Sequence, residues 1–303
     1  MSRRLDLFNL AARTLVKPLL RRQKDVARAR RSFARLTRLL TRPPAHMVRL
    51  TDTAVRGEWI WVGKARRRGV ILYLHGGGYI MGSPRTHRAM VARLSRLSGL
   101  RAFVPDYRLA PEHPFPAAIE DARVAWDQLI ALGYRSDEII LGGDSAGGGL
   151  ALALLAQLCA AGQPPRALFA FSPWTDLTLS GASMTENAET DVLFPAYRAG
   201  ELRDMIVSAK KASDPAVSPL FARFPECPPV FMQCSQSEIL RDDTLRMGKR
   251  LRSFGADVTV QVLPGRPHVW QLFDRLLPEA KQALRETAAF IAAVFPAPRS
   301  NDN

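Results

Sequence analysis

Short apolar segments that alternate with segments of helical periodicity constrain the fold of this chain more than any other feature. Apolar runs with the length of buried strands lie at 69–74, 101–105, 138–142, 167–171, 229–233 and 258–263. Helical patterns follow most of them, at 85–98, 116–132, 146–161, 242–254 and 278–295. Because parallel strands need helical crossovers, this alternation predicts an α/β fold, with a mainly parallel central sheet flanked by helices.

Two segments depart from this rhythm. Residues 1–50 hold two amphipathic helical patterns, and we expect Pro18 to end or kink the first. The polar stretch 178–212 is inserted between two strands and ends in a helical pattern over 196–211. We expect both segments to form a helical cap over a main domain of residues 51–303. The apolar face of the first helix is predicted to contain Leu5, Phe8, Ala12, Leu15, Val16 and Leu19.

The positive charge is concentrated at one end of the chain. The formal net charge is +15. Residues 1–42 contain thirteen basic and two acidic residues, a net charge of +11, which leaves +4 for the rest. No motif interleaves basic with aromatic residues, so nucleic acid is not a predicted partner. The basic amphipathic helices are compatible with a weak membrane-surface contact, but helices packed on the domain with solvated arginines are the favoured interpretation.

No export signal or membrane-spanning segment is predicted. The apolar residues after Arg4 are interrupted by Asp6, Asn9 and Arg13. The longest apolar segment, 139–162, carries five glycines in its first half, which suits a strand, a sharp turn and a buried helix. The three cysteines form no CxxC pair. We therefore expect a cytoplasmic protein with reduced thiols, and a homodimer stays possible.

The sharpest chemical signal is the sequence Gly143-Asp144-Ser145-Ala146-Gly147. It fits the pattern G-x-S-x-G and lies between a predicted strand and a predicted helix, which is the context of a nucleophile elbow. Such a turn presents the serine hydroxyl at its tip, above a helix N-terminus. Ser145 is therefore the predicted nucleophile.

A second signal, His75-Gly76-Gly77-Gly78, directly follows the strand that ends at residue 74. Acyl transfer places negative charge on an oxygen atom, and backbone amides fixed in advance stabilise that charge. Glycines let the amides approach without a side chain in the way. The predicted donors of this oxyanion hole are the amides of Gly77, Gly78 and Ala146.

Together these motifs resemble the hormone-sensitive-lipase-like branch of the α/β-hydrolase family, which includes carboxylesterases and arylacetamide deacetylase-like enzymes. The stretches that carry the resemblance span residues 75–273: HGGGYIMGSPRTHR, DYRLAPEHPFPAAIEDA, GDSAGGGLALAL, DPAVSPL and PHVWQLF. The resemblance implies an α/β-hydrolase fold with a helical cap. It also implies a serine hydrolase that acts on esters without a cofactor, with residues 51–303 as the catalytic domain.

The remaining triad members follow from chain order and from the resemblance. Hydrolases of this fold carry serine, acid and histidine in that order, and only His268 lies after Ser145. The family usually has Asp-Pro-Leu at the acid position, and alignment with this chain places Glu238 there. Asp242 is the alternative acid, although we expect it to cap the following helix.

The sequence thus predicts a carboxylic ester hydrolase for small to medium hydrophobic esters, acetyl esters or lactones. An amidase or deacetylase that cleaves C–N bonds is an alternative, because the triad would be the same. A ligand receptor of this fold, like the plant gibberellin receptors, is disfavoured by the presence of both Ser145 and His268. No metal-ligand spacing and no nucleotide-binding glycine motif occurs, so no metal or cofactor is predicted.

Overall fold

The computed structural model describes residues 2–65 and 68–295, and its centre is an eight-stranded sheet. The strand order is β1-β2-β4-β3-β5-β6-β7-β8. Strand β2 is antiparallel to β1 and β4, and the other pairs are parallel, which confirms the mainly parallel sheet. The strands are β1 Met47–Asp52, β2 Gly57–Val62, β3 Val70–Leu74, β4 Arg101–Pro105, β5 Ile139–Asp144, β6 Ala167–Phe171, β7 Val230–Ser235 and β8 Val258–Leu263.

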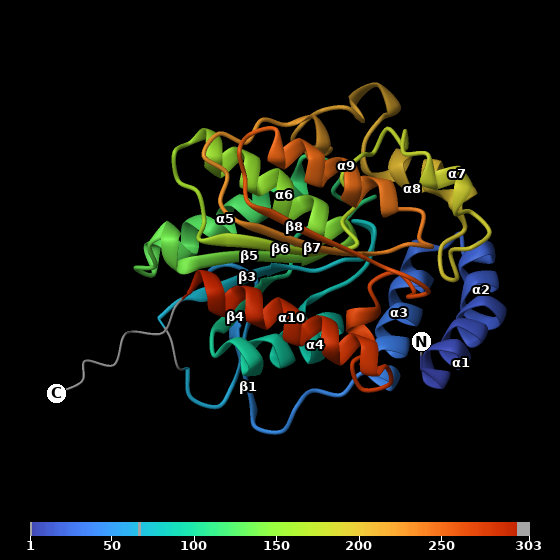
Figure 1. The fold of residues 1–303 in the computed structure, drawn as a ribbon, viewed down its shortest axis with the longest axis horizontal. Coiled ribbons are helices and arrows are strands. Elements are labelled where there is room, and N and C mark those ends of the chain that lie inside the picture. Colours follow the sequence, from blue (N-terminus) through green and yellow to red (C-terminus); the bar gives the residue numbers. More distant parts are fainter. Residues whose placement is uncertain (1, 66–67, 296–303) are drawn as a thin grey trace.

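Helices cover both faces of this sheet (Figure 1). Helices α4 (Pro84–Ser98) and α10 (Pro278–Val294) lie on one face. Helices α5 (Ala117–Ala131), α6 (Ser145–Ala160) and α9 (Arg241–Arg252) lie on the other. These bounds agree with the predicted helices to within a few residues, and the sandwich buries the sheet on both sides.

Strand β3 illustrates why its residues form a central strand. All five of its residues are buried. Successive side chains point to opposite faces of a sheet. Val70, Leu72 and Leu74 accordingly join the core on the α5 and α6 side, and Ile71 and Tyr73 join the core on the α4 and α10 side. A strand with two buried faces needs a continuous apolar run, which is the pattern that predicts it.

The antiparallel strands β1 and β2 were not expected. Strand β1 is mostly exposed at the sheet edge, so it lacks the apolar run that marks a buried strand. Strand β2 buries only Gly57 and Ile60. Residues 47–50, grouped by sequence with the N-terminal helices, are part of β1.

The N-terminal helices (residues 3–40) run differently from the prediction. A first helical rod contains α1 (Arg3–Ala11), a π-helical turn (Ala12–Val16) and α2 (Lys17–Arg22). Pro18 therefore does not end the helix. In an α-helix a proline ring collides with the carbonyl four residues earlier, and the wider π-turn just before Pro18 gives room for it. Helix α3 (Val26–Leu40) follows.

The insertion at residues 178–212, called the cap insertion below, lies beside the N-terminal helices (Figure 1). It contains α7 (Ser183–Glu186), α8 (Ala199–Ile206) and two short 3-10 turns, Ala196–Arg198 and Ala209–Lys211. The helix predicted over 196–211 is interrupted at Val207, whose backbone is extended. Three further 3-10 turns are Ser136–Glu138, Pro219–Phe221 and Trp270–Phe273.

Within residues 2–65 and 68–295, no helix combines the length and the apolar character that crossing a bilayer requires.

Candidate active site

Ser145 lies at the tip of a tight turn between β5 and α6. Its φ of +52° is a conformation that residues with side chains rarely adopt. Two residues on, Gly147 packs so tightly that a Cβ atom would lie 2.1 Å from the carbonyl oxygen of Leu74. Only glycine fits there, which explains the spacing of the motif. The local fold is that of the predicted nucleophile elbow.

Asp144 is buried beneath the elbow and bonds to three neighbours. Its Oδ1 accepts hydrogen bonds from the Tyr73 hydroxyl at 2.7 Å and the Gly76 amide at 3.0 Å. Its Oδ2 lies 3.3 Å from Nε2 of His87. Burial alone would raise the pKa of Asp144, but the charge and hydrogen bond of His87 and the Tyr73 hydroxyl outweigh it, and the pKa is lowered. Asp144 thus ties the glycine loop to the elbow, and His87 is a partner that sequence reasoning missed.

The glycine loop after β3 bends back over the start of α6. Gly77 has a φ of +126°, and its carbonyl accepts hydrogen bonds from the amides of Ile80 and Met81. A Cβ at Gly77 would lie 2.2 Å from the Met81 carbonyl oxygen, so this turn too requires glycine. Gly78 and Ser145 line the same pocket. Ala146 lies in the first turn of α6, where backbone amides have no partner within the helix.

Glu238 and His268 meet at the carboxyl end of the sheet. Oε2 of Glu238 lies 2.6 Å from Nδ1 of His268, and Oε1 accepts a hydrogen bond from the Ser235 amide at 2.9 Å. Burial acts to lower the pKa of His268, but the hydrogen bond and the charge of Glu238 outweigh it, and the pKa is raised. The structure therefore brings together the acid and the histidine that the sequence predicts.

The other imidazole nitrogen points away from Glu238. Nε2 of His268 is buried and has no hydrogen-bond partner among the described residues, Ser145 included. The ring of Phe194 packs edge-on against the imidazole, with 4.8 Å between ring centroids. The loop after β6 links the two parts of the site: the Trp174 amide donates to the Ser145 carbonyl, and Ser172 Oγ accepts a weak hydrogen bond from the Val269 amide.

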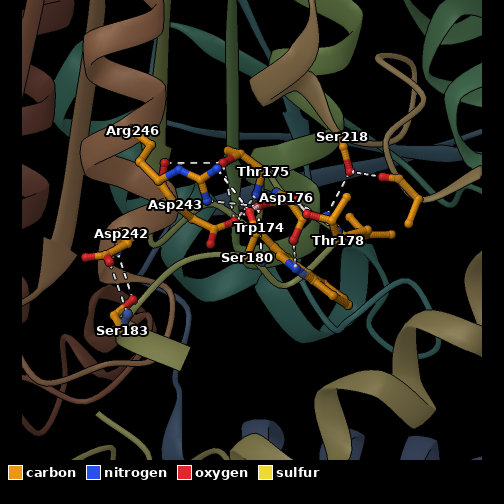
Figure 2. A network of polar contacts seen from close by, with 12 residues as sticks. Trp174, Thr175, Asp176, Thr178, Ser180, Ser183, Ser218, Asp242, Asp243 and Arg246 are labelled. Atoms are coloured by element: carbon orange, nitrogen blue, oxygen red, sulfur yellow. Dashed lines mark hydrogen bonds and ion pairs between the residues drawn. The ribbon is translucent and has the colours of Figure 1, made fainter. Parts of the chain in front are cut away.

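Asp242, the alternative acid, has other partners (Figure 2). Its Oδ2 accepts a hydrogen bond from the backbone amide of Ser183 at 3.0 Å, at the start of α7, and its Oδ1 accepts one from Arg241. The expectation that it caps α9 is wrong, because Leu240 holds the N-cap position of α9. Asp242 caps α7 of the cap insertion instead.

A buried polar network joins α9 to the loop after β6 (Figure 2). Asp243 accepts hydrogen bonds from the backbone amides of Thr175 at 2.7 Å and Asp176 at 2.9 Å. Arg246 donates to Asp176 at 2.9 Å. Burial, with the nearby charge of Asp176, raises the pKa of Asp243 to about 7, although the backbone hydrogen bonds oppose the shift. The network fixes α9, whose first residues follow Glu238, against the loop that holds Trp174.

Ser145 lines a pocket with about 970 Å³ of empty space, part of which opens to solvent. Gly78 contributes to the same wall. Both the N-terminal helices and the cap insertion contribute side chains, and most of the lining is apolar. The apolar lining includes Leu20, Val26, Ile80, Met81, Trp174, Met184, Phe194, Leu202, Met205, Ile239 and Leu240.

Three basic residues connect the walls of the pocket by donating hydrogen bonds to backbone carbonyls. Arg30 of α3 donates to the carbonyls of Ile80 and Ala110 at 2.7 and 2.9 Å and pairs with both oxygens of Glu112. Lys17 is buried and donates to the carbonyls of Ala188 and Asp191. Arg198 of the cap insertion donates to the carbonyls of Leu20 and Gln23. The sequence did not predict these contacts, because its pattern does not distinguish a basic residue that binds a carbonyl from one that is only solvated.

The loops that carry the acid and the histidine are also held from outside. In the acid loop (residues 236–240), the Ile239 amide donates to the Asp191 carboxylate at 3.0 Å, and the Glu238 carbonyl accepts from the Asn187 side chain at 2.8 Å. In the histidine loop (residues 264–269), the Gly265 carbonyl accepts from Asn9 of α1 at 2.8 Å. The described residues contain no cluster of three or more side chains suited to a metal ion.

Comparison with known proteins settles the family. A family model for the alpha/beta hydrolase fold matches residues 71–272. The chain belongs to the α/β-hydrolase family. It is 36% identical over 265 residues to an esterase of Acinetobacter venetianus, with 86% of each chain covered. It is 36% identical over 233 residues to an acetyl-hydrolase of Streptomyces hygroscopicus, covering 76% of this chain and 78% of the relative.

The similarity to solved structures extends over more of the chain. An esterase from the bacterial hormone-sensitive lipase family superposes with a TM-score of 0.90 at 38% identity, covering 97% of this chain and 98% of the other. The hydrolase described here is thus a member of the hormone-sensitive-lipase-like branch and a serine ester hydrolase.

Proposed function

We propose that this hydrolase cleaves small to medium hydrophobic carboxylic esters, acetyl esters included, with Ser145, His268 and Glu238 as its catalytic triad. The observation that carries the proposal is the buried Glu238–His268 pair beside an apolar pocket that Ser145 lines. An acid that holds Nδ1 of a histidine leaves Nε2 as the base, which is the arrangement that activates a serine hydroxyl.

In the first half-reaction, Nε2 of His268 takes the proton of the Ser145 hydroxyl as Oγ attacks the ester carbonyl carbon. Glu238 holds the imidazole in orientation and stabilises its positive charge. The oxygen of the tetrahedral intermediate accepts hydrogen bonds from the amides of Gly77, Gly78 and Ala146. His268 then gives its proton to the leaving alkoxide, and an acyl-enzyme remains on Ser145.

Water completes the reaction through the same groups. His268 removes a proton from a water molecule as its oxygen attacks the acyl carbon, and the proton returns to Oγ of Ser145 when the acid product leaves. The absence of a hydrogen bond from Nε2 of His268 to Ser145 is compatible with this role, because catalytic hydrogen bonds often tighten only when substrate binds.

The walls of the pocket support the substrate class. Nonpolar side chains from the N-terminal helices and the cap insertion surround the serine, so an acyl chain gains free energy by leaving water. Charged groups lie at only a few positions of the lining, among them Lys24 and Arg198. The printed name of the Streptomyces relative, an acetyl-hydrolase, supports acetyl esters as one substrate class.

The test is a panel of p-nitrophenyl esters of rising acyl length, run beside the matching anilides and a lactone. We expect turnover of the short and medium esters, complete inhibition by a covalent serine reagent, and labelling of Ser145 by that reagent. Faster turnover of the anilides than of the matching esters would identify an amide, and not an ester, as the preferred substrate. Binding of ligand without any turnover would favour a receptor.

A further inference from the structure

The first helical rod exposes a row of leucines that the fold does not use. Leu7, Leu10, Leu15 and Leu19 have 69%, 59%, 64% and 68% of their surfaces exposed. Two of them, Leu15 and Leu19, were expected on the inner face of this rod. Leu5 and Ala12, which were expected on the same face, are buried there. Single exposed leucines are ordinary, but four on one 20-residue rod call for a partner.

The π-helical turn explains why these leucines face the same way. An α-turn takes 3.6 residues, and a π-turn, with hydrogen bonds from residue i to i+5, takes about one more. The eight residue steps from Leu7 to Leu15 contain about one α-turn and one π-turn. Leu15 therefore lies about two full turns after Leu7, on the same side of the rod. Leu10 and Leu19 follow Leu7 and Leu15 at the i+3 and i+4 spacings of one helix face. The four side chains, which we call the leucine stripe, therefore line one side of the rod.

Positive charge surrounds the leucine stripe. Its two ends carry the exposed pairs Arg3–Arg4 and Arg21–Arg22, and Asp6 is the one acidic residue between residues 3 and 22. Across residues 1–42, eleven of the thirteen basic side chains are exposed. A covering partner must therefore offer apolar surface and negative charge together.

We propose that the leucine stripe docks this hydrolase on the surface of an anionic lipid bilayer. A bilayer interface supplies hydrocarbon for the leucines and phosphate groups for the arginines, which is how basic amphipathic helices bind in the plane of a membrane. A second copy of the chain fits less well, because it would bring another segment with a net charge of +11 against the first.

Docking would leave the catalytic domain undisturbed, because the rod uses its opposite face to hold the enzyme. On that inner face the ring of Phe8 packs at a tilt against the ring of Phe273, Asn9 bonds to Gly265 and Lys17 bonds to Asp191. At the end of the rod, Leu20 lines the active-site pocket. The membrane would therefore lie on the side of the molecule that α1 and α2 occupy (Figure 1).

Vesicle flotation of the full chain tests this proposal. One set of vesicles is phosphatidylcholine alone, and the other contains a fraction of phosphatidylglycerol. We expect the protein to float with the phosphatidylglycerol vesicles, to stay behind with phosphatidylcholine, and to be released as the salt concentration rises. The combined variant Leu7→Gln, Leu15→Gln, Leu19→Gln should bind the anionic vesicles at least about tenfold more weakly, since glutamine keeps helix propensity and removes the apolar contact.

A matched variant provides the control. Val124, Ile130 and Leu132 are exposed at 52%, 40% and 53% on α5 and its C-cap, far from the rod in sequence. Replacing all three by glutamine should leave flotation unchanged. Both variants should keep the melting temperature and the activity on a water-soluble ester, since none of these leucines, valine or isoleucine is in the site.

Three results would overturn the proposal. The first is absence of flotation with phosphatidylglycerol vesicles at low salt. The second is equal binding by the leucine-stripe variant and the wild type. The third is a concentration-dependent dimer in gel filtration that only the leucine-stripe variant loses, which would assign the stripe to a second copy of the chain.

Discussion

Ser145, the proposed nucleophile, has a strained backbone conformation. A non-glycine residue with positive φ costs on the order of 1–3 kcal/mol, which the surrounding structure must offset. Close packing of Gly147 against β3 and the buried bonds of Asp144 hold the turn in that conformation. None of these contacts involves the Ser145 hydroxyl, so the hydroxyl is free for chemistry and its loss should leave the turn intact.

Ser145→Ala should therefore abolish ester turnover without unfolding the protein. Loss of a triad nucleophile lowers turnover on the order of 10⁴-fold or more. The measurement is turnover of a p-nitrophenyl ester together with the melting temperature. A folded variant that still turns over the ester at the wild-type rate would remove Ser145 from the mechanism.

Glu238→Gln should lower turnover by orders of magnitude with little change in melting temperature. An amide cannot balance the charge of the imidazolium and favours the wrong tautomer. It also removes the interaction that raises the pKa of His268, so the acid limb of the rate–pH profile, where His268 becomes protonated, should move to lower pH.

Asp242→Asn is the matched control for Glu238→Gln. Its amide oxygen can still accept the hydrogen bond from Ser183 at the start of α7, so activity should stay near the wild-type value. If Asp242→Asn were the inactive enzyme and Glu238→Gln the active one, the acid role would belong to Asp242.

The side chain of Arg30 joins helix α3 to the glycine loop after β3. Arg30 bonds to the carbonyl of Ile80, two residues after Gly78, and to Glu112 on a neighbouring loop. The ion pair holds the pKa of Glu112 near 2, so it stays charged through the neutral range. Val26 and Ala29 of the same helix line the pocket. The position of α3 thus sets one wall of the substrate site.

Arg30→Met should consequently change substrate selectivity more than it changes the chemistry. With α3 loosened, KM for the longer acyl esters should rise several-fold, while kcat on an acetyl ester changes little. Arg31→Met, at an exposed neighbouring position, is the control and should behave as wild type. Equal effects of the two variants, or a uniform loss across all esters, would argue against this role of Arg30.

The buried elements of this fold were predictable from sequence, and the exposed ones were not. Strands such as β3 and β6 are continuous apolar runs because both faces are covered, and local pattern suffices to find them. Strand β1 is mostly exposed and its apolar residues form no continuous run, so no comparable pattern marks it. The π-turn depends on how the rod packs around Pro18. The hydrophobic periodicity of the sequence carries no information about that packing.

The same contrast holds for the candidate site. Ser145 and His268 follow from a short motif and from chain order, and Glu238 from alignment to a family. Asn9 and Lys17 reach partners 256 and 174 residues away, and no local pattern reports such a contact. Pairing of this kind is a property of the tertiary structure.

The stability of the whole molecule should depend on the pH through Asp243. In the unfolded chain an aspartate has a pKa near 4, and in the folded protein that of Asp243 is about 7. Between these values the folded state keeps a proton that the unfolded state has released. This contribution to stability is therefore full below about pH 4 and is lost as the pH rises to about 7, at up to about 1.4 kcal/mol per pH unit.

Asp243→Asn should flatten this part of the profile. Asparagine can accept the hydrogen bonds from Thr175 and Asp176 but does not titrate. Denaturant unfolding from about pH 4 to pH 7 measures the effect, with Asp242→Asn for comparison. The same slope in wild type and Asp243→Asn would mean that this carboxyl does not titrate as described.

The contacts of α1 also bear on the order in which the molecule assembles. Ser2 bonds to Glu279 and Asn9 to Gly265, so the first helix is secured by residues from near the other end of the described chain. At a synthesis rate of about 5–20 residues per second, 256 residues take roughly 10–50 s. During that time α1 has no binding site to occupy, while the strands and helices between can already pair. Helix α1 thus leaves the ribosome well before the residues that hold it, and its apolar side chains stay accessible to chaperones until those residues have been made.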